Sequence, residues 1–350
     1  MRIAQIAPLT ESVPPRTYGG TERVVSYLTE ELMAMGHDVT LFASGDSVTS
    51  AKLESAWPVA LRFDATLRDA MAPQMLLMEK LYQRAHEFDV LHCHLDYWPF
   101  SLLSRQQTPF LTTLHGRLDL PELTRVYECF KHAPLVSISD AQRRPLPGAN
   151  FVGTVHHGLP PDLLRPVAMK REYLAFLGRI CPEKSPDRAI RIARDAGMKL
   201  KIAAKVDRVD RAYFETTIRP LIDGDQVEMI GEIGDAEKPA FLSGAKALLL
   251  PIEWPEPFGL VMIEAMACGT PTIAFPAGSV PEVIEHGLTG FIVHDESAAA
   301  AAVSRLDRLS SELIRARFEE RFTARRMAED YLALYRRIAV RSRPALRVVT

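Results

Sequence analysis

The chain has 350 residues with 42 basic and 44 acidic side chains, and its formal net charge of −2 gives no electrostatic case for binding nucleic acid. It is longer than one hydrophobic core usually extends, so two domains are expected. No apolar run is long enough for a stable membrane span, and the four cysteines (Cys93, Cys129, Cys181 and Cys268) are too dispersed for a zinc site or a disulfide framework. The first strand-like segment lacks the apolar length and cleavage site of a signal peptide, so we expect a cytoplasmic protein, with peripheral attachment at the inner membrane face left open.

Short apolar runs alternate with helical patterns along the first half of the chain. Apolar residues recur at helical spacing from Val24 to Leu32, which predicts a long helix that ends at Gly36. The strands predicted in this half are 2–7, 38–43, 90–94, 110–114, 135–138 and 151–155. A proline-rich stretch at 157–166 then predicts a linker.

The same alternation restarts after this linker. The strands predicted in the second half are 173–177, 200–204, 227–230, 247–250 and 272–275, and a final helical pattern contains Tyr331, Leu332, Leu334, Tyr335 and Ile338. Strands that alternate with helices are typical of parallel, doubly wound α/β sheets.

Polar and glycine-rich signals follow the predicted strands at their carboxyl ends, where ligands of such sheets bind. In the first half these are Gly19, Gly20 and His115; in the second half they are Gly178, Arg179, Lys184, the 231–234 loop and Glu256. Gly19-Gly20 is either a tight turn or a place where backbone N–H groups approach a diphosphate. His115 is either a structural histidine or a sugar contact. Lys205 either adds a phosphate contact or is solvated.

The segment 253–270 combines several of these signals. The spacing of Leu260, Ile263 and Ala267 predicts a helix that begins near Phe258 or Gly259, directly after a buried strand. The first N–H groups of a helix have no partner within it and bind anions such as phosphate. Glu264 lies about 7 Å further along the helix axis, a distance that suits the hydroxyls of an attached ribose.

The two runs Glu-Pro-Phe-Gly and Glu-Ala-Met-Ala-Cys-Gly-Thr-Pro in this segment resemble the nucleotide-sugar loop of retaining glycosyltransferases of family 4. The resemblance extends over nearly the whole chain. It implies the α/β fold called GT-B, in which two Rossmann-like domains with doubly wound parallel sheets face each other across a cleft. By this resemblance residues 1–158 form the acceptor-side domain, completed by a C-terminal helix at 324–345, and residues 159–323 form the nucleotide-sugar-binding domain.

The resemblance also implies roles for single residues. Arg179 and Lys184 would bind the diphosphate, Glu264 the ribose, and Glu256 the transferred sugar. The predicted catalytic residues are His115, Arg179, Lys184 and Glu256. The predicted donor-binding residues are Gly19, Gly20, Gly231, Ile233, Phe258, Gly259, Leu260 and Glu264, with the base against 231–234. The chain departs from the common pattern at Lys205, where relatives often carry a small or glycine-rich turn.

The expected function is therefore the retaining transfer of a hexose from a nucleoside-diphosphate sugar, a UDP- or GDP-sugar, to a hydroxyl of a glycan, lipid-linked or small-molecule acceptor. Fixed cations and a helix start at the leaving diphosphate can replace a divalent metal, so neither a metal nor a cofactor is expected. Asp223-Gly-Asp225 precedes a strand and is interpreted as a turn; His92, His94 and Asp96 lack a matching fourth partner for a metal site. Two alternatives stay open, a GT-B-like sugar-nucleotide epimerase and a catalytically silent module that binds sugar nucleotides.

Overall fold

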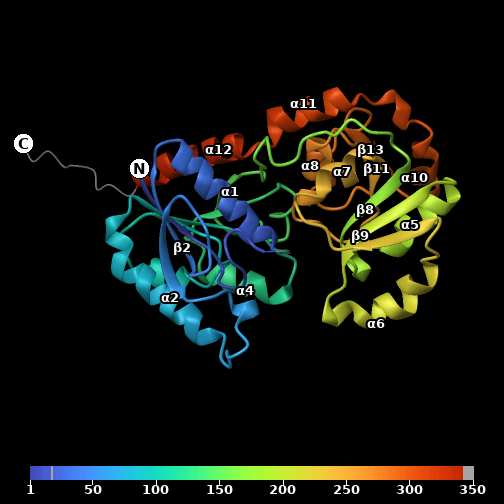
Figure 1. Ribbon diagram of the computed structural model, residues 1–350. Helices are drawn as coiled ribbons and strands as arrows, with labels where there is room; N and C mark the ends of the chain where they lie inside the picture. Colours follow the sequence, from blue (N-terminus) through green and yellow to red (C-terminus); the bar gives the residue numbers. More distant parts are fainter. Residues whose placement is uncertain (17–18, 342–350) are drawn as a thin grey trace, which may run out of the picture. The chain divides into compact units, whose positions relative to one another are not determined.

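The structure is a computed structural model that describes residues 1–16 and 19–341 (Figure 1). The chain divides into two compact units. Of the described residues, the first contains those within Met1–Gly158 together with Ala324–Arg341, and the second contains Leu159–Thr323. Each unit has its own parallel sheet, so the predicted α/β, doubly wound fold class is confirmed. That two such domains face each other across a cleft stays a prediction. Within the described ranges, no helix combines the length and apolar character that a membrane span needs.

The sheet of the first unit has the strand order β3-β2-β1-β4-β5-β6-β7, and all neighbouring strands are parallel. Its strands are β1 (Arg2–Ile6), β2 (Asp38–Ser44), β3 (Lys52–Trp57), β4 (Val90–Cys93), β5 (Phe110–Thr113), β6 (Leu135–Ser137) and β7 (Phe151–Thr154). Its helices are α1 (Gly20–Ala34), α2 (Met71–Arg84), α3 (Phe100–Leu103), α4 (Pro121–Cys129) and α12 (Ala324–Arg341).

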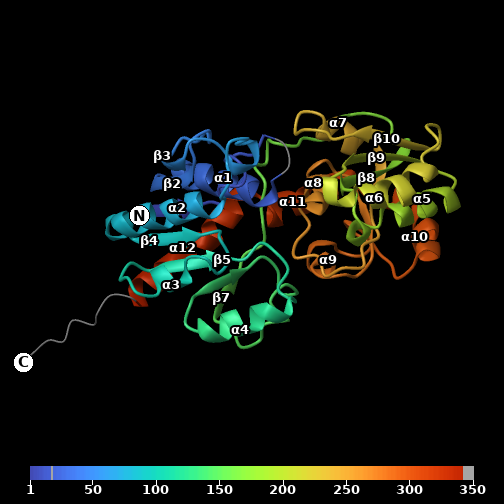
Figure 2. The ribbon, with the colours of Figure 1, turned by 90° about the horizontal axis from the view of Figure 1, so that it is seen from below.

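In helix α1 the local sequence determines both the buried face and the C-terminal end. Its buried face includes Val24, Val25, Leu28 and Leu32, which pack toward the sheet. The helix ends before Gly36, which has a φ of 81° and whose added Cβ would meet nothing within 4 Å. Glycine adopts this left-handed conformation without the steric cost of a side chain, so Gly36 terminates the helix as predicted. Helix α12 packs along α1 (Figures 1 and 2), so this helix is part of the first unit although it follows the second unit in the sequence.

The sheet of the second unit has the order β10-β9-β8-β11-β12-β13 and is also parallel. Its strands are β8 (Tyr173–Arg179), β9 (Lys199–Lys205), β10 (Val227–Gly231), β11 (Ala245–Leu250), β12 (Thr272–Ala274) and β13 (Gly290–Ile292). Its helices are α5 (Pro186–Asp195), α6 (Arg211–Tyr213), α7 (Lys238–Ser243), α8 (Leu260–Ala267), α9 (Val280–Val283), α10 (Glu296–Val303) and α11 (Ser311–Arg321).

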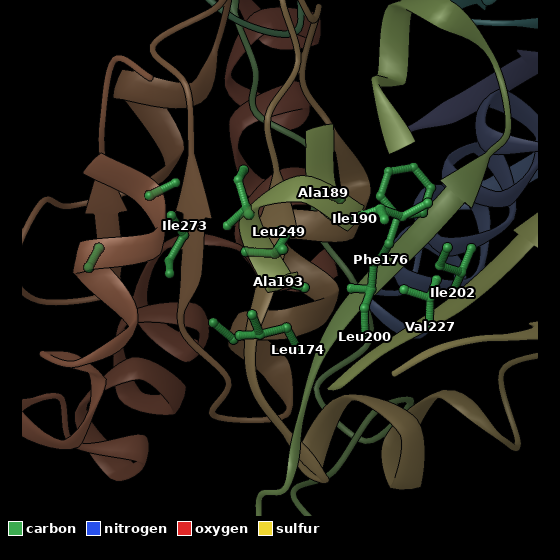
Figure 3. Packing of buried hydrophobic residues seen from close by; sticks show 14 of the residues in the cluster. Leu174, Phe176, Ala189, Ile190, Ala193, Leu200, Ile202, Val227, Leu249 and Ile273 are labelled. Carbon is green, nitrogen blue, oxygen red and sulfur yellow. The ribbon is translucent and has the colours of Figure 1, made fainter. Parts of the chain in front are cut away.

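The core of the second unit lies between this sheet and α5. Figure 3 shows Leu174 and Phe176 of β8 beside Leu249 of β11, packed against Ile190 of α5, and all four are buried. Every strand predicted from an apolar run is present within one or two residues of its predicted bounds. Strands β3 and β13 were not predicted. β3 is a half-exposed edge strand with polar residues, and β13 has only three residues, so neither contains an extended apolar run.

Candidate active site

The strand order of the second unit reverses between β8 and β11, which are neighbours although two strands separate them in the sequence. In open α/β sheets ligands bind at this reversal, outside the carboxyl ends of the strands. Arg179 is the last residue of β8, and β11 ends at Leu250 and continues into the loop that carries Glu256. The predicted phosphate and sugar residues of this unit are therefore brought together at one sheet edge.

The loop between β11 and α8 is fixed by backbone contacts. Gly259 caps α8 in the left-handed region with a φ of 77°, and a Cβ there would lie 2.8 Å from the terminal methyl carbon of Met262. A Cβ on Gly278 would lie 2.3 Å from the carbonyl oxygen of Glu256, so only glycine fits beside the loop. Ser279 donates from its backbone N–H to that carbonyl (2.9 Å) and from its hydroxyl to the carbonyl of Phe258 (2.8 Å). The start of α8 is thereby held in one orientation.

Lys184 and Glu256 meet at this edge. The carboxylate of Glu256 is buried and accepts from the ammonium of Lys184, and from the indole N–H of Trp254 at 3.1 Å. The Lys184 Nζ also lies 5.1 Å from the centre of the Trp254 ring, within the range of a cation–π contact. Lys184 belongs to the short turn Pro182–Lys184, which is followed by Ser185 in the left-handed region with a φ of 50°. A cation, a carboxylate and an aromatic ring thus form one compact group.

Glu264 of α8 is buried and forms an ion pair with Lys238, the first residue of α7. Nζ of Lys238 donates to Oε1 of Glu264 at 2.7 Å and lies 3.1 Å from Oδ1 of Asp235. The predicted base-binding loop leads directly into α7: Gly231 has a φ of 85°, and Ile233 is half-buried. The ion pair connects this loop to the carboxylate predicted to bind the ribose.

Arg179 lies close to two acidic residues of the segment that follows β9. Its guanidinium lies 3.8 Å from Asp207 and 3.5 Å from Asp210. Lys205 lies 3.0 Å from Asp207, so it is part of an ion-pair network rather than solvated alone. A diphosphate that binds these cations has to compete with the carboxylates. Separately, Asp223 is confirmed as a turn residue, because its Oδ1 accepts from three successive backbone N–H groups at residues 225–227.

The first unit has its own polar edge. Gly19 caps α1, and a Cβ there would lie 2.7 Å from Cβ of Pro15, so close packing as well as backbone approach favours glycine. Gly20 is exposed at the first position of the helix. Glu22 in the first turn is buried, and this burial raises the pKa of its carboxyl group.

His115 follows β5 and is enclosed by other rings. Its Nε2 lies 2.8 Å from Nδ1 of His94, and its ring stacks on that of His157 with the centres 5.3 Å apart. Gln142 donates to the carbonyls of Leu114 and Gly116, both at 2.8 Å, and so holds the backbone on either side of His115. Burial lowers the pKa of His115 to about 3, and the imidazole is neutral at physiological pH.

The metal interpretation of His92, His94 and Asp96 finds no support in the geometry. Both ring nitrogens of His92 and of His94 already have hydrogen-bond partners. In residues 1–16 and 19–341, no three His, Cys, Asp or Glu side chains are grouped so that they could hold a metal ion.

Comparison with known proteins supports the resemblance to glycosyltransferases of family 4. A family model described as Glycosyl transferases group 1 matches residues 165–325, and one described as Glycosyltransferase Family 4 matches residues 18–135. The chain belongs to the family 4 glycosyltransferases.

Two relatives and one solved structure illustrate the range of this family. The D-inositol 3-phosphate glycosyltransferase of Mycolicibacterium smegmatis is 30% identical over 208 residues, 55% of this chain and 44% of the relative, so the match spans less than half of that relative's length. The phosphatidyl-myo-inositol mannosyltransferase of Mycobacterium leprae is 24% identical over 352 residues, 91% of this chain and 90% of the relative. The sucrose-phosphate synthase structure from Thermosynechococcus elongatus has a TM-score of 0.79 at 22% identity and covers 97% of this chain and 99% of its own, which supports the GT-B fold.

Several residues at the two edges of this family 4 chain were not found by sequence reasoning. They are Lys238, Trp254, Asp207, Asp210, Gly278 and Ser279 in the second unit, and Gln5 and Gln142 in the first. His94 was considered only as a metal ligand and not as a partner of His115. One signal was available for Lys238, because it follows the predicted base-binding loop by four residues at a helix start. Trp254 lies two residues before its partner Glu256 in the loop itself. Most of the others act on partners distant in the sequence.

Proposed function

We propose that the protein is a retaining hexosyltransferase that transfers a sugar from a nucleoside-diphosphate sugar to an acceptor hydroxyl. The observation that carries this proposal is the grouping of Lys184, Glu256, the start of α8 and Glu264 at the strand reversal of the second sheet. This edge offers cations and backbone N–H groups to a diphosphate, and buried carboxylates to sugar hydroxyls on both sides of it.

The charges at this edge suit the reaction. Cleavage of the bond between the anomeric carbon and the diphosphate develops negative charge on the leaving group. Lys184, Arg179 and the N–H groups at the start of α8 are positioned donors for that charge. The diphosphate competes for the two cations with the carboxylates that already bind them. Transfer without a divalent metal is therefore part of the proposal.

The acidic residues have separate tasks. Glu264, held by Lys238, accepts hydrogen bonds from the ribose hydroxyls, and Glu256, held by Lys184 and Trp254, accepts from hydroxyls of the transferred sugar. As the acceptor oxygen forms its bond to the anomeric carbon, the carbon–diphosphate bond breaks. The proton of the acceptor hydroxyl passes to an oxygen of the leaving diphosphate on the same face, which retains the anomeric configuration. This route needs no enzymic nucleophile.

The donor is proposed to be a UDP- or GDP-sugar, and the acceptor a hydroxyl of a carbohydrate, a lipid-linked sugar or a small molecule. The names of the two relatives refer to inositol-containing compounds and to a mannosyl group, which places polyol acceptors first among those to test. We propose no cofactor beyond the nucleotide sugar.

The test uses the purified protein with a panel of UDP- and GDP-sugars, with and without polyol and sugar acceptors, in the presence of EDTA. The expected result is acceptor-dependent release of nucleoside diphosphate and a product of unchanged anomeric configuration by NMR. An altered sugar still attached to its nucleotide would support the epimerase alternative, and binding without any turnover would support the silent module. Turnover that EDTA abolishes and magnesium or manganese restores would overturn the metal-independent part of the proposal.

A further inference from the structure

A continuous chain of hydrogen bonds runs through the interior of the first unit from His115 to α12. It consists of seven side chains, in the order His115, His94, Gln5, Tyr335, His92, Thr113 and Tyr331. The links are between 2.7 and 3.0 Å long. All members except His115 are buried, whereas His115 is half-buried at the carboxyl end of β5. The series of hydrogen bonds therefore connects the half-buried imidazole of His115 to six buried side chains.

Gln5 sets the direction of this chain, because its oxygen can only accept and its nitrogen can only donate. Its Nε2 donates to the hydroxyl of Tyr335 at 3.0 Å, and its Oε1 faces Nε2 of His94 at 2.9 Å. The proton of His94 is therefore on Nε2. A neutral imidazole supplies one donor and one acceptor, so the direction at Gln5 fixes the link from His94 to His115. A hydroxyl has one donor and two acceptor lone pairs, and in the arrangement in which each hydroxyl donates along the series, Tyr335 donates to Nδ1 of His92 and Nε2–H of His92 donates to Thr113.

The tautomer of His94 determines the tautomer of His115. Because His94 carries its proton on Nε2, its Nδ1 is an acceptor, and His115 must donate to it from Nε2–H. The imidazole of His115 is neutral, since burial lowers its pKa to about 3, so its Nδ1 is left as an unprotonated acceptor. Among the residues that the structure describes, the hydrogen bond of the His115 ring is the one from Nε2 to Nδ1 of His94.

The position of the ring is fixed independently of its protonation. Gln142 holds the carbonyls of Leu114 and Gly116, and His157 stacks on the ring face. With the position fixed in this way, the tautomer is the property that decides what His115 can bind.

We propose that Gln5 and His94 are positioning residues that hold His115 as the Nε2–H tautomer, so that Nδ1 of His115 accepts a hydrogen bond from a hydroxyl of the carbohydrate ligand. The identity of this ligand rests on the proposed function, whereas the tautomer does not. Ionised phosphate and carboxylate groups have no proton to donate, so an acceptor nitrogen selects hydroxyls against them. The hydroxyl belongs either to the transferred sugar or to the acceptor molecule.

The first test is the protonation state of the wild-type protein. Long-range 1H–15N spectra of protein with 15N-labelled histidine distinguish protonated from unprotonated ring nitrogens, and single His→Asn variants assign the signals. We expect His92, His94 and His115 each to carry one proton, on Nε2. Protons on Nδ1 of His94 and His115 would overturn the proposal. This experiment needs no substrate, so its outcome does not depend on transferase activity.

The second test asks whether Gln5, among the hydrogen-bonded side chains, determines the tautomer of His115. Gln5→Leu keeps the size of the side chain but leaves the Nε2–H of His94 without an acceptor. His94 is then expected to carry its proton on Nδ1 and donate to His115, which becomes protonated on Nδ1. Gln5→Glu keeps an oxygen facing His94 and should retain the wild-type tautomer. An unchanged His115 tautomer in Gln5→Leu would show that Gln5 does not position it.

Thr113→Val is the matched control. It also removes two hydrogen bonds from the buried chain, to His92 and Tyr331, but at the end distant from His115. We expect lower stability and an unchanged His115 tautomer. If Gln5→Leu does not fold, the wild-type spectrum still decides the proposal.

Kinetics identify the hydroxyl. With an active donor and acceptor, Gln5→Leu should lower kcat at least tenfold and leave the Kd of the free nucleoside diphosphate unchanged. A deoxy donor that lacks the bound hydroxyl should be slower than the parent donor with wild-type protein but not with Gln5→Leu, and deoxy acceptors test the other source. If the wild-type protein and Gln5→Leu discriminate equally between parent and deoxy compounds, for every donor and acceptor, His115 does not accept a hydrogen bond from a hydroxyl of the ligand. Correct tautomers without any glycosyl transfer would contradict the proposed function and leave the positioning role intact.

Discussion

Lys238 and Glu264 form a buried ion pair in the second unit, with Nζ of Lys238 2.7 Å from Oε1 of Glu264 and side-chain exposures of 11% and 6%. Lys238 is the first residue of α7, which follows the loop proposed to bind the base. Glu264 lies within α8 and carries the carboxylate proposed to bind the ribose. The pair therefore holds the Glu264 carboxylate in one orientation before a nucleotide binds.

Lys238→Met should destabilise the protein and weaken donor binding together. Removing one partner of a buried ion pair leaves the other charge uncompensated, which costs roughly 3–5 kcal/mol. Urea unfolding and calorimetric titration with nucleoside diphosphate measure the two effects. Lys199→Met removes an exposed lysine, whose side chain is 62% accessible, and should change neither quantity. Unchanged affinity in a folded Lys238→Met protein would show that the pair has no role in the donor site.

Glu264→Ala should raise the Kd of the donor. Each lost hydrogen bond from a ribose hydroxyl to the carboxylate is worth roughly 1.5–3 kcal/mol, or about ten- to a hundredfold in Kd. Calorimetric titration with nucleoside diphosphates and with their 2′-deoxy analogues measures the effect. The deoxy analogue should lose affinity for the wild-type protein and little for Glu264→Ala. Equal losses with both proteins would remove Glu264 from the ribose site.

Lys184→Met and Arg179→Met should lower kcat more than they raise KM. The negative charge that these cations meet increases toward the transition state, so their contribution is larger there than with bound substrate. Steady-state kinetics with the active donor measures both parameters. An increase in KM with unchanged kcat would mean that the cations bind the ground state and the transition state equally.

Gly259→Ala should weaken donor binding, whereas Gly36→Ala should not. Both glycines have a φ in the left-handed region, 77° and 81°, so alanine costs each of them about 1–2 kcal/mol of backbone strain. Only at Gly259 does the added Cβ also meet neighbours, Met262 at 2.8 Å and Glu256 at 3.2 Å. Comparison of thermal stability and nucleotide affinity separates strain from site distortion. If both variants bind the nucleotide as the wild type does, the start of α8 is not part of the donor site.

Acidification should destabilise the protein below pH 6.5. Burial lowers the pKa of His92, His94 and His157 well below the ordinary value of 6.5, and that of His115 to about 3. Between these values the unfolded chain binds protons that the folded chain does not, so the free energy of unfolding falls as the pH falls through this window. Each group contributes up to about 1.4 kcal/mol per pH unit. Urea unfolding across the range measures the slope, which His92→Asn should reduce by one proton. A slope near zero would contradict the neutral state of the cluster.

The sequence by itself determined the strands and the edge at which polar residues gather. Apolar runs such as 200–204 predict buried parallel strands, and the direction of a parallel strand places whatever follows it, such as Glu256, at the carboxyl edge. This inference needs only local pattern and chain direction. It did not extend to β3 and β13, because a polar edge strand and a three-residue strand contain too little apolar pattern.

Only the tertiary structure decided which partners the polar residues have. Lys238 and Glu264 are 26 positions apart, Lys184 and Glu256 are 72 apart, and Gln5 and Tyr335 are 330 apart. Hydrogen bonds and ion pairs depend on distances of a few ångströms and on burial, and packing of helices and strands sets both. A sequence pattern identifies the residues that can carry charge, whereas the fold decides which of them are adjacent, buried and held in one orientation.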